Sequence, residues 1–259
     1  MRKLWVIECN QLHLARVITT IGYRKIREKM DLNIGSLLDE ARSFFKEKNY
    51  PLSLECYKLF FERSSDVKGY GAVRLSYCLS EWVALGKLYP RALEVLSQKK
   101  NEALNEFIKT KSWSIFHDFI SICEHLECEE EAVDVFYKMH NSDKKSAAKI
   151  FPLIYKQLTK RSEWELCKGY MGNGYAEYQR ILRGYDFDVE HAKKLEGDFK
   201  KDYEKSAEQE VIEDIFLILK MLYKTGCQDE LDKADEIIEA DFNKRKRPDI
   251  YKAIIDKCT

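Results

Sequence analysis

The stretch SLLDEARSFFKEKNYPLSLECYKLFFER, residues 36–63, contains two amphipathic patterns separated by one break at Asn49–Pro51. Apolar residues recur at helical spacing on each side of the break, which predicts two helices. Pro51 suits the first turn of the second helix, where its missing N–H removes no helical hydrogen bond. Because so short a turn makes the helices pack antiparallel, the stretch predicts a helical hairpin. The predicted apolar stripes consist of Leu37, Leu38, Ala41, Phe44 and Phe45, followed by Leu52, Cys56, Leu59 and Phe60, widened by Leu54, Tyr57 and Phe61.

The second helix of this hairpin recurs twice along the chain. YPLSLECY at residues 50–57 corresponds to YPRALEVL at residues 89–96, and a third copy reads EEAVDVF at residues 130–136. Helical patterns at 73–85 and 113–126 precede the later copies. A repeat period of about 20–50 residues is typical of stacked helical hairpins. Small residues, which let two helix backbones approach closely, fall in register at Ser53, Ala92 and Ala132.

Residues 41–62 (ARSFFKEKNYPLSLECYKLFFE) resemble the tetratricopeptide-repeat proteins. The small, aromatic, small and aromatic positions of that motif are occupied by Ala41, Phe44, Ser53 and Tyr57. The likeness extends over residues 36–140, with Ser80 and Ile120 at the first small position of the later copies. The family repeats every 34 residues or about that. The copies in this chain are 39 and 40 residues apart. The residues in excess of the family's period are therefore expected in the loops between repeats.

The resemblance implies an all-α fold in which antiparallel helix hairpins form a right-handed superhelical array, an α-solenoid. Such arrays present an extended concave surface that serves recognition. In the family, first-helix positions offset from the small residue line this groove. We therefore expect a non-catalytic scaffold that binds a protein or peptide partner, with charges too mixed in sign for the carboxylate clamp of the family. The expected partner-binding residues are Arg42, Phe45, Arg74, Tyr77, Glu81, His117, Ser121 and Glu124.

Charge is unevenly distributed along a chain whose formal net charge is zero. Residues 1–30 contain seven Lys/Arg and two Glu, which predicts a basic amphipathic capping helix. Peripheral contact of residues 11–29 with a membrane surface is the alternative for this segment. Degenerate repeats are expected over residues 31–171, and acidic helical hairpins with a terminal cap over residues 172–259. With 18 acidic and eight basic residues, the segment 186–241 repels phosphate, and no nucleic-acid partner is expected.

The last third of the chain shows further helical spacing and no membrane span. Gly226 suits the position after a helix end, because glycine adopts a positive φ freely. No stretch approaches the roughly 18 apolar residues of a span. Of the eight cysteines, Cys56, Cys78 and Cys167 lie in contexts where each behaves as a small apolar residue on a helix, which favours a reducing, cytoplasmic location. Helices are predicted over residues 175–185, 188–205, 208–225 and 229–242, with a short one after Pro248.

Cys123, His125 and Cys128 form the most metal-like group in the sequence. Structural zinc sites need four ligands, and no second pair is evident. On a helix, Cys123 and His125 point about 200° apart. We therefore predict that Cys123 belongs to the core and His125 to the surface, with no metal. The glycine cluster at 169–174 has neither the order nor the preceding strand of a phosphate-binding loop.

No hydrolase signature or nucleophile pattern occurs in the sequence, so neither a cofactor nor enzymatic activity is expected. Two alternatives to the scaffold hypothesis remain at this stage. The chain could be an accessory or regulatory domain of an enzyme system, such as envelope-polysaccharide synthesis, with catalysis on a separate chain. It could also be an enzyme with an all-α cavity, for which the Glu-rich helices and His191 would supply the chemistry.

Overall fold

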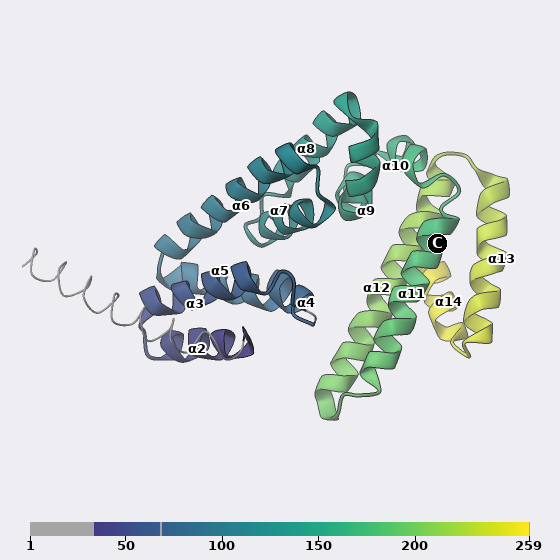
Figure 1. The fold of residues 1–259 in the computed structure, drawn as a ribbon. Coiled ribbons are helices and arrows are strands. Elements are labelled where there is room, and N and C mark those ends of the chain that lie inside the picture. The colour runs from purple at the N-terminus through teal and green to yellow at the C-terminus, as the bar shows by residue number, and fades with distance from the viewer. Residues whose placement is uncertain (1–33, 68, 259) are drawn as a thin grey trace, which may run out of the picture. The chain divides into compact units, whose positions relative to one another are not determined.

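The computed structural model describes residues 34–67 and 69–258, which lie in helices and the connections between them. The expected all-α class is confirmed, since no strand occurs in this part of the chain. None of the helices described has the length and apolar character needed to cross a bilayer. The elements are α2 (Ile34–Lys46), α3 (Tyr50–Arg63), α4 (Gly71–Val73), the π-helical segment η1 (Arg74–Cys78), α5 (Leu79–Leu88), α6 (Arg91–Thr110), α7 (Trp113–His125), α8 (Glu129–Ser142), α9 (Lys144–Lys160), α10 (Trp164–Met171), α11 (Tyr175–Ala192), α12 (Gly197–Lys224), α13 (Gln228–Lys244) and α14 (Pro248–Cys258) (Figure 1).

The chain divides into two compact units, which we call the N-terminal unit and the C-terminal unit. The division falls between Val135 and Phe136, whereas the sequence pattern placed a boundary after residue 171. The predicted basic helix over residues 1–30, including the segment 11–29, lies outside the described residues. Each unit is therefore considered by itself, starting with the hairpins of the N-terminal unit.

Successive helices of the N-terminal unit alternate in direction. Arg74 Nε on η1 donates to the Phe61 carbonyl oxygen on α3, and Cys78 Sγ one turn later lies 3.7 Å from the Tyr57 carbonyl oxygen. Residue numbers thus rise along η1 as they fall along α3, so these elements are antiparallel. Helices α2 and α3 pack together across a short turn, and so do α5 and α6. The predicted hairpins at residues 36–63 and 73–96 are present.

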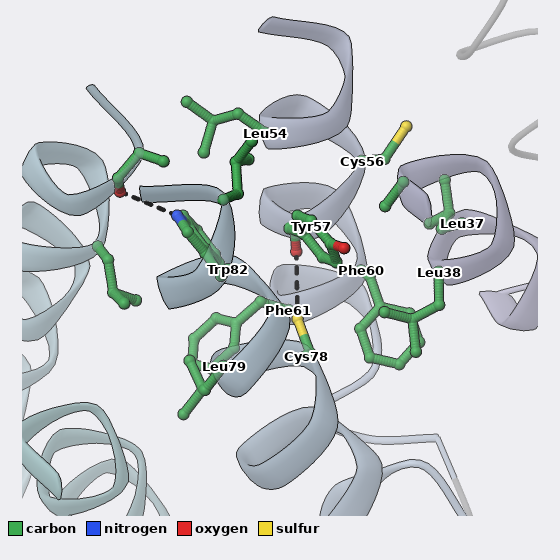
Figure 2. Close-up of a cluster of buried hydrophobic side chains, with 14 of the residues drawn as sticks. Leu37, Leu38, Leu54, Cys56, Tyr57, Phe60, Phe61, Cys78, Leu79 and Trp82 are labelled. Atoms are coloured by element: carbon green, nitrogen blue, oxygen red, sulfur yellow. Dashed lines mark hydrogen bonds between the residues drawn. The ribbon is translucent and has the colours of Figure 1, made fainter. Parts of the chain in front are cut away.

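A hydrophobic core lies among α2, α3 and α5 (Figure 2). Phe60 and Trp82 are fully buried within it. The Trp82 Nε1–H donates to the Ala92 carbonyl oxygen at 2.9 Å, which satisfies the only polar group of that side chain. Phe61 contacts Trp82 edge-on, with ring centroids 6.3 Å apart. Every residue of the two predicted stripes at 37–61 is buried or partly buried, so the prediction is confirmed.

The small residues at the repeated position are completely buried. Ser53, Ala92 and Ala132 each have 0% of their surface exposed. The Ser53 hydroxyl also donates to the Ala41 carbonyl oxygen at 2.8 Å, a side-chain bond that spans the hairpin interface. A larger side chain at this position would separate the two helices. The close approach expected from the sequence register is therefore confirmed.

The register of the second hairpin's first helix differs from the sequence alignment. That alignment placed Ser80 at the small buried position, but Ser80 is exposed, and Trp82 instead lies on the core side. The cause is the length of the turn. Helix α5 continues to Leu88, immediately before the Tyr89–Pro90 turn, whereas α2 ends at Lys46 and leaves a longer connection before α3. Because the turn after α5 is shorter, the residues of α5 that face the core lie closer to its C-terminal end. Position 80 therefore no longer needs a small residue.

In the C-terminal unit, α12 packs against α9, α10, α11, α13 and α14. Its end matches the prediction, because Gly226 has φ +69° and the Cys227 N–H donates to the Leu222 carbonyl oxygen at 3.0 Å. This is the Schellman arrangement that ends many helices. The predicted helix 188–205 is wrong in its bounds. Helix α11 continues to Ala192 and α12 begins at Gly197, which has a positive φ, so the break lies within the stretch predicted as helical.

Candidate partner-binding face

The residues expected to bind a partner lie on α2, on η1–α5 and on α7, the segments predicted as first helices of the repeats. Two contacts show how η1–α5 and α7 are oriented. Arg74 pairs with Asp118, and Ser80, farther along α5, lies 3.2 Å from His125 Nε2, farther along α7. Both helices therefore run in the same direction, with their side chains in contact. We call the surface formed by α2, η1–α5 and α7 the first-helix face.

Arg42 and Glu81, both expected to contact a partner, bind each other. Arg42 Nη2 lies 2.8 Å from Glu81 Oε1, and Arg42 Nε donates to the same carboxylate at 3.0 Å. The Tyr57 hydroxyl donates to Glu81 Oε2 at 3.2 Å, and Asp39 lies 3.3 Å from Arg42 Nη1. The hydrogen bond to Glu81 raises the pKa of Arg42, while burial and the Glu81 charge raise the pKa of Tyr57. The pair joins α2 to α5 and neutralises both charges.

Arg74 is buried, which corrects the expectation that it is available to a partner. Its Nε donates to the Phe61 carbonyl oxygen at 2.7 Å, and Nη1 and Nη2 donate to the two Asp118 oxygens at 2.5 Å. Its guanidinium also lies over the Phe61 ring, 4.0 Å from the centroid. Phe61 belongs to the last turn of α3, where carbonyls have no partner within the helix. Arg74 therefore ties α3 to α7 from inside the unit.

On α7, residues spaced four apart form a stripe. Trp113 contacts His117, with ring centroids 4.9 Å apart, and burial lowers the pKa of His117. Ser121 is 5% exposed, so its side chain is not accessible to a partner, contrary to expectation. The Ser121 carbonyl oxygen can only accept, so His125 Nδ1 donates to it at 2.8 Å. In the neutral ring Nε2 of His125 then accepts a hydrogen bond from the Ser80 hydroxyl, and this bond connects α7 to α5.

Two aromatic side chains on these helices are accessible. Tyr77 is 55% exposed and Trp113 is 45% exposed, and Glu124 is also exposed. Phe45 is half-buried against the core, 6.0 Å from the Tyr50 ring. In the sequence pattern, Trp113 marks only the start of a predicted helix. Its spacing of four residues from His117 is the signal that could have placed it on this face.

The metal-like group of the sequence has structural roles. Cys123 is buried, and burial raises the pKa of its thiol, whereas His125 is held between α5 and its own helix. Cys128 Sγ lies 3.7 Å from Lys100 Nζ. No group of three or more metal-ligating side chains assembles anywhere in the described part of the chain. The prediction that Cys123 belongs to the core is confirmed.

The glycine cluster also serves packing. Gly174 precedes α11 with φ +74°, a conformation that side chains disfavour. A Cβ at this position would lie 2.6 Å from Ile218 Cγ2 on α12. Glycine is therefore required for the close approach of these segments, as expected for a turn and not for a phosphate loop.

Comparisons of the chain with protein families, with curated proteins and with solved structures find no match. The resemblance to tetratricopeptide repeats therefore rests on the residues at 36–140. The arrangement of the first helices rests on the contacts described above.

Proposed function

We propose that the N-terminal unit is a non-catalytic protein-interaction module that binds a segment of another protein on the first-helix face. In this proposal its hairpins belong to a right-handed superhelical array of the tetratricopeptide-like kind. Two hairpins support it, α2–α3 and η1–α5 with α6, whose first helices contact each other and α7, because stacked hairpins present an extended surface for recognition.

The observation that carries the proposal is the pairing of charges beside exposed aromatic rings. Arg42 is paired with Glu81, and Arg74 with Asp118, so these groups need no ligand. Tyr77 and Trp113 remain exposed on the same set of helices. Aromatic side chains are the residues that most often dominate binding energy at protein interfaces. The expected partner is therefore a segment with apolar anchor residues, bound with a weak dependence on salt.

Affinity capture from a lysate of the source cells, with the captured proteins identified by mass spectrometry, tests the proposal. The informative variant is Tyr77→Ser/Trp113→Ser, which removes both exposed rings and, among the contacts described above, only the one between Trp113 and His117. A suitable control is Ile108→Ser, because this residue is 50% exposed and lies on α6, a second helix outside the first-helix face. Substitution of Arg74 is unsuitable for this test, because it would remove buried contacts with Phe61 and Asp118 and disturb the fold.

The proposal predicts a discrete partner that is retained by wild type and by the control but lost from the aromatic variant. Retention by all three proteins would move the binding surface away from the first-helix face. Equal loss from the control and the aromatic variant would indicate general stickiness of apolar surface. Circular dichroism of each variant checks that helicity is unchanged.

A further inference from the structure

A cavity of about 480 Å³ is lined by residues of α12, α13 and α14 in the C-terminal unit. Its apolar lining comes from Phe216 and Leu219 on α12, Leu231 on α13 and Ile255 on α14. Sites for small molecules usually have volumes of about 300–1,000 Å³ and combine apolar walls with a few polar groups. The cavity is therefore large enough for a small molecule and can bury its apolar part. We call it the α12–α13 cavity.

Opposite charges stand on the two walls of this cavity. Lys220 and Lys224 line it from α12, and Asp232 and Asp235 line it from α13. Within the described residues neither lysine has a carboxylate partner. The Lys220 ammonium instead lies 5.1 Å from the centroid of the Phe216 ring. The cavity lining thus has cations on one helix and carboxylates on another.

The carboxylates are positioned by other residues. Asp235 accepts a hydrogen bond from the Tyr251 hydroxyl at 3.1 Å, and Asp232 accepts one from Gln228 Nε2 at 2.7 Å. Both bonds are to neutral donors, so each carboxylate keeps its full negative charge and further acceptor capacity. A third cation in the lining, Lys257, is already paired with Glu213 at 2.6 Å. The charges without an ionic partner are therefore two ammonium groups on one wall and two carboxylates on the other.

We propose that the α12–α13 cavity binds a free α-amino acid with an aromatic or branched aliphatic side chain. Its carboxylate would pair with Lys220 and Lys224, and its ammonium group with Asp235 and Asp232. The side chain would pack against the apolar lining. A ligand with a single charge would leave the charged groups of one wall without an ionic partner. An uncharged ligand would leave the charged groups of both walls without one. This ligand site is independent of the function proposed for the N-terminal unit.

Calorimetric titration of the full chain with L-tryptophan, L-phenylalanine and L-leucine tests the proposal directly. Two analogues separate the contributions of the walls, since indole-3-propionate lacks the ammonium group and tryptamine lacks the carboxylate. Each analogue is expected to bind at least about tenfold more weakly than L-tryptophan, because a hydrogen bond to a charged group contributes at least that factor.

Variants locate the site. Lys220→Gln and Asp235→Asn are each expected to weaken binding of L-tryptophan about tenfold. The asparagine keeps an acceptor for Tyr251. Lys252→Gln is the matched control, because Lys252 is an exposed lysine of α14 outside the cavity lining, and its affinity should equal that of wild type.

A second measurement reports on the cavity itself. Cys258 is exposed and lines the cavity, so bound amino acid should slow its alkylation by iodoacetamide. Cys227, which is not part of the lining, is the internal reference. The proposal is overturned if none of the three amino acids binds at millimolar concentration. Equal binding of indole-3-propionate and L-tryptophan, or binding that leaves Cys258 and both variants unaffected, would overturn it too.

Discussion

Replacing Arg74 by methionine should destabilise the N-terminal unit far more than the loss of an ordinary surface ion pair. Methionine keeps an unbranched apolar side chain but lacks the guanidinium that lies over the Phe61 ring, and with it every side-chain hydrogen-bond donor. The Asp118 carboxylate then loses its two bonds, and the Phe61 carbonyl oxygen loses the donor at the end of α3. Both acceptors remain in a largely buried environment.

The magnitude follows from burial. The side chains of Arg74 and Asp118 are 7% and 16% exposed. Removing one partner of a buried ion pair costs about 3–5 kcal/mol, because the other charge is left unpaired. Since Asp118 keeps some contact with water, we expect the lower end, about 3 kcal/mol. Arg91→Met is the control, because Arg91 and Glu94 form a pair whose side chains are 54% and 60% exposed, which predicts a loss of about 0–1 kcal/mol.

Native-state thiol labelling measures this effect within one unit. Cys78 is fully buried at the end of η1, so it reacts only when the N-terminal unit opens. A loss of about 3 kcal/mol corresponds to labelling that is about 150-fold faster, provided that closing outpaces the reagent. Cys167, buried in the C-terminal unit, is the reference and should react at the wild-type rate. Mass spectrometry of the labelled peptides resolves the two thiols.

If Arg74→Met speeds labelling of Cys78 no more than Arg91→Met does, the loss of the buried Arg74–Asp118 pair does not destabilise the N-terminal unit as predicted. A double variant, Arg74→Met/Asp118→Leu, checks the cause. Replacing a buried pair by apolar residues is often nearly neutral, so the double variant should recover much of the lost stability. Equal losses in the single and double variants would show that packing around Arg74, and not the unpaired carboxylate, carries the effect.

Three further predictions concern stability, measured as the free energy of unfolding in urea. Gly86→Ala should lower it by about 1–3 kcal/mol, because the new Cβ would lie 2.4 Å from Leu93 Cγ. Gly184→Ala should raise it by about 0.5–1 kcal/mol, since this glycine lies inside α11 with no atom near its Cβ position; a loss instead would show an unrecognised contact. Burial lowers the pKa of His117 below its ordinary value of 6.5, so at mildly acidic pH the unfolded chain binds a proton more readily than the folded chain does. The free energy of unfolding should therefore fall as the pH falls below about 6.5. His117→Gln should flatten that decline between pH 8 and pH 5, and an unchanged profile would contradict the assignment.

Much of the local structure of this chain could be predicted from its sequence. The stripe from Leu37 to Phe61 identified two helices and the faces that meet, because helical spacing decides which side chains share a face. Ser53 and Ala92 marked the close approach, and Gly226 marked a helix end. Each of these features depends on residues within a few turns of one another, which a linear pattern records.

Other features could not be read in this way. The repeat alignment placed Ser80 in the core because it assumed equal turns, whereas the shorter turn before Pro90 places Trp82 there. Arg74 has the same residue type and spacing as a groove cation, yet it is buried and bonded to α3 and α7. The partner of a long charged side chain depends on the rotation and offset of neighbouring helices, and no periodicity encodes either.

The linear pattern of residues was enough to show that this chain is helical, where its first hairpin turns, and that Ser53 and Ala92 lie at helix interfaces. Those properties follow from the spacing of side chains along single helices and from the backbone preferences of proline and glycine. Tertiary structure alone decided that the charges of the first-helix face pair with one another, that Tyr77 and Trp113 remain exposed, and that lysines and carboxylates face each other across the α12–α13 cavity. Packing of the cores sets those distances, because it determines how each helix is rotated and shifted against the next.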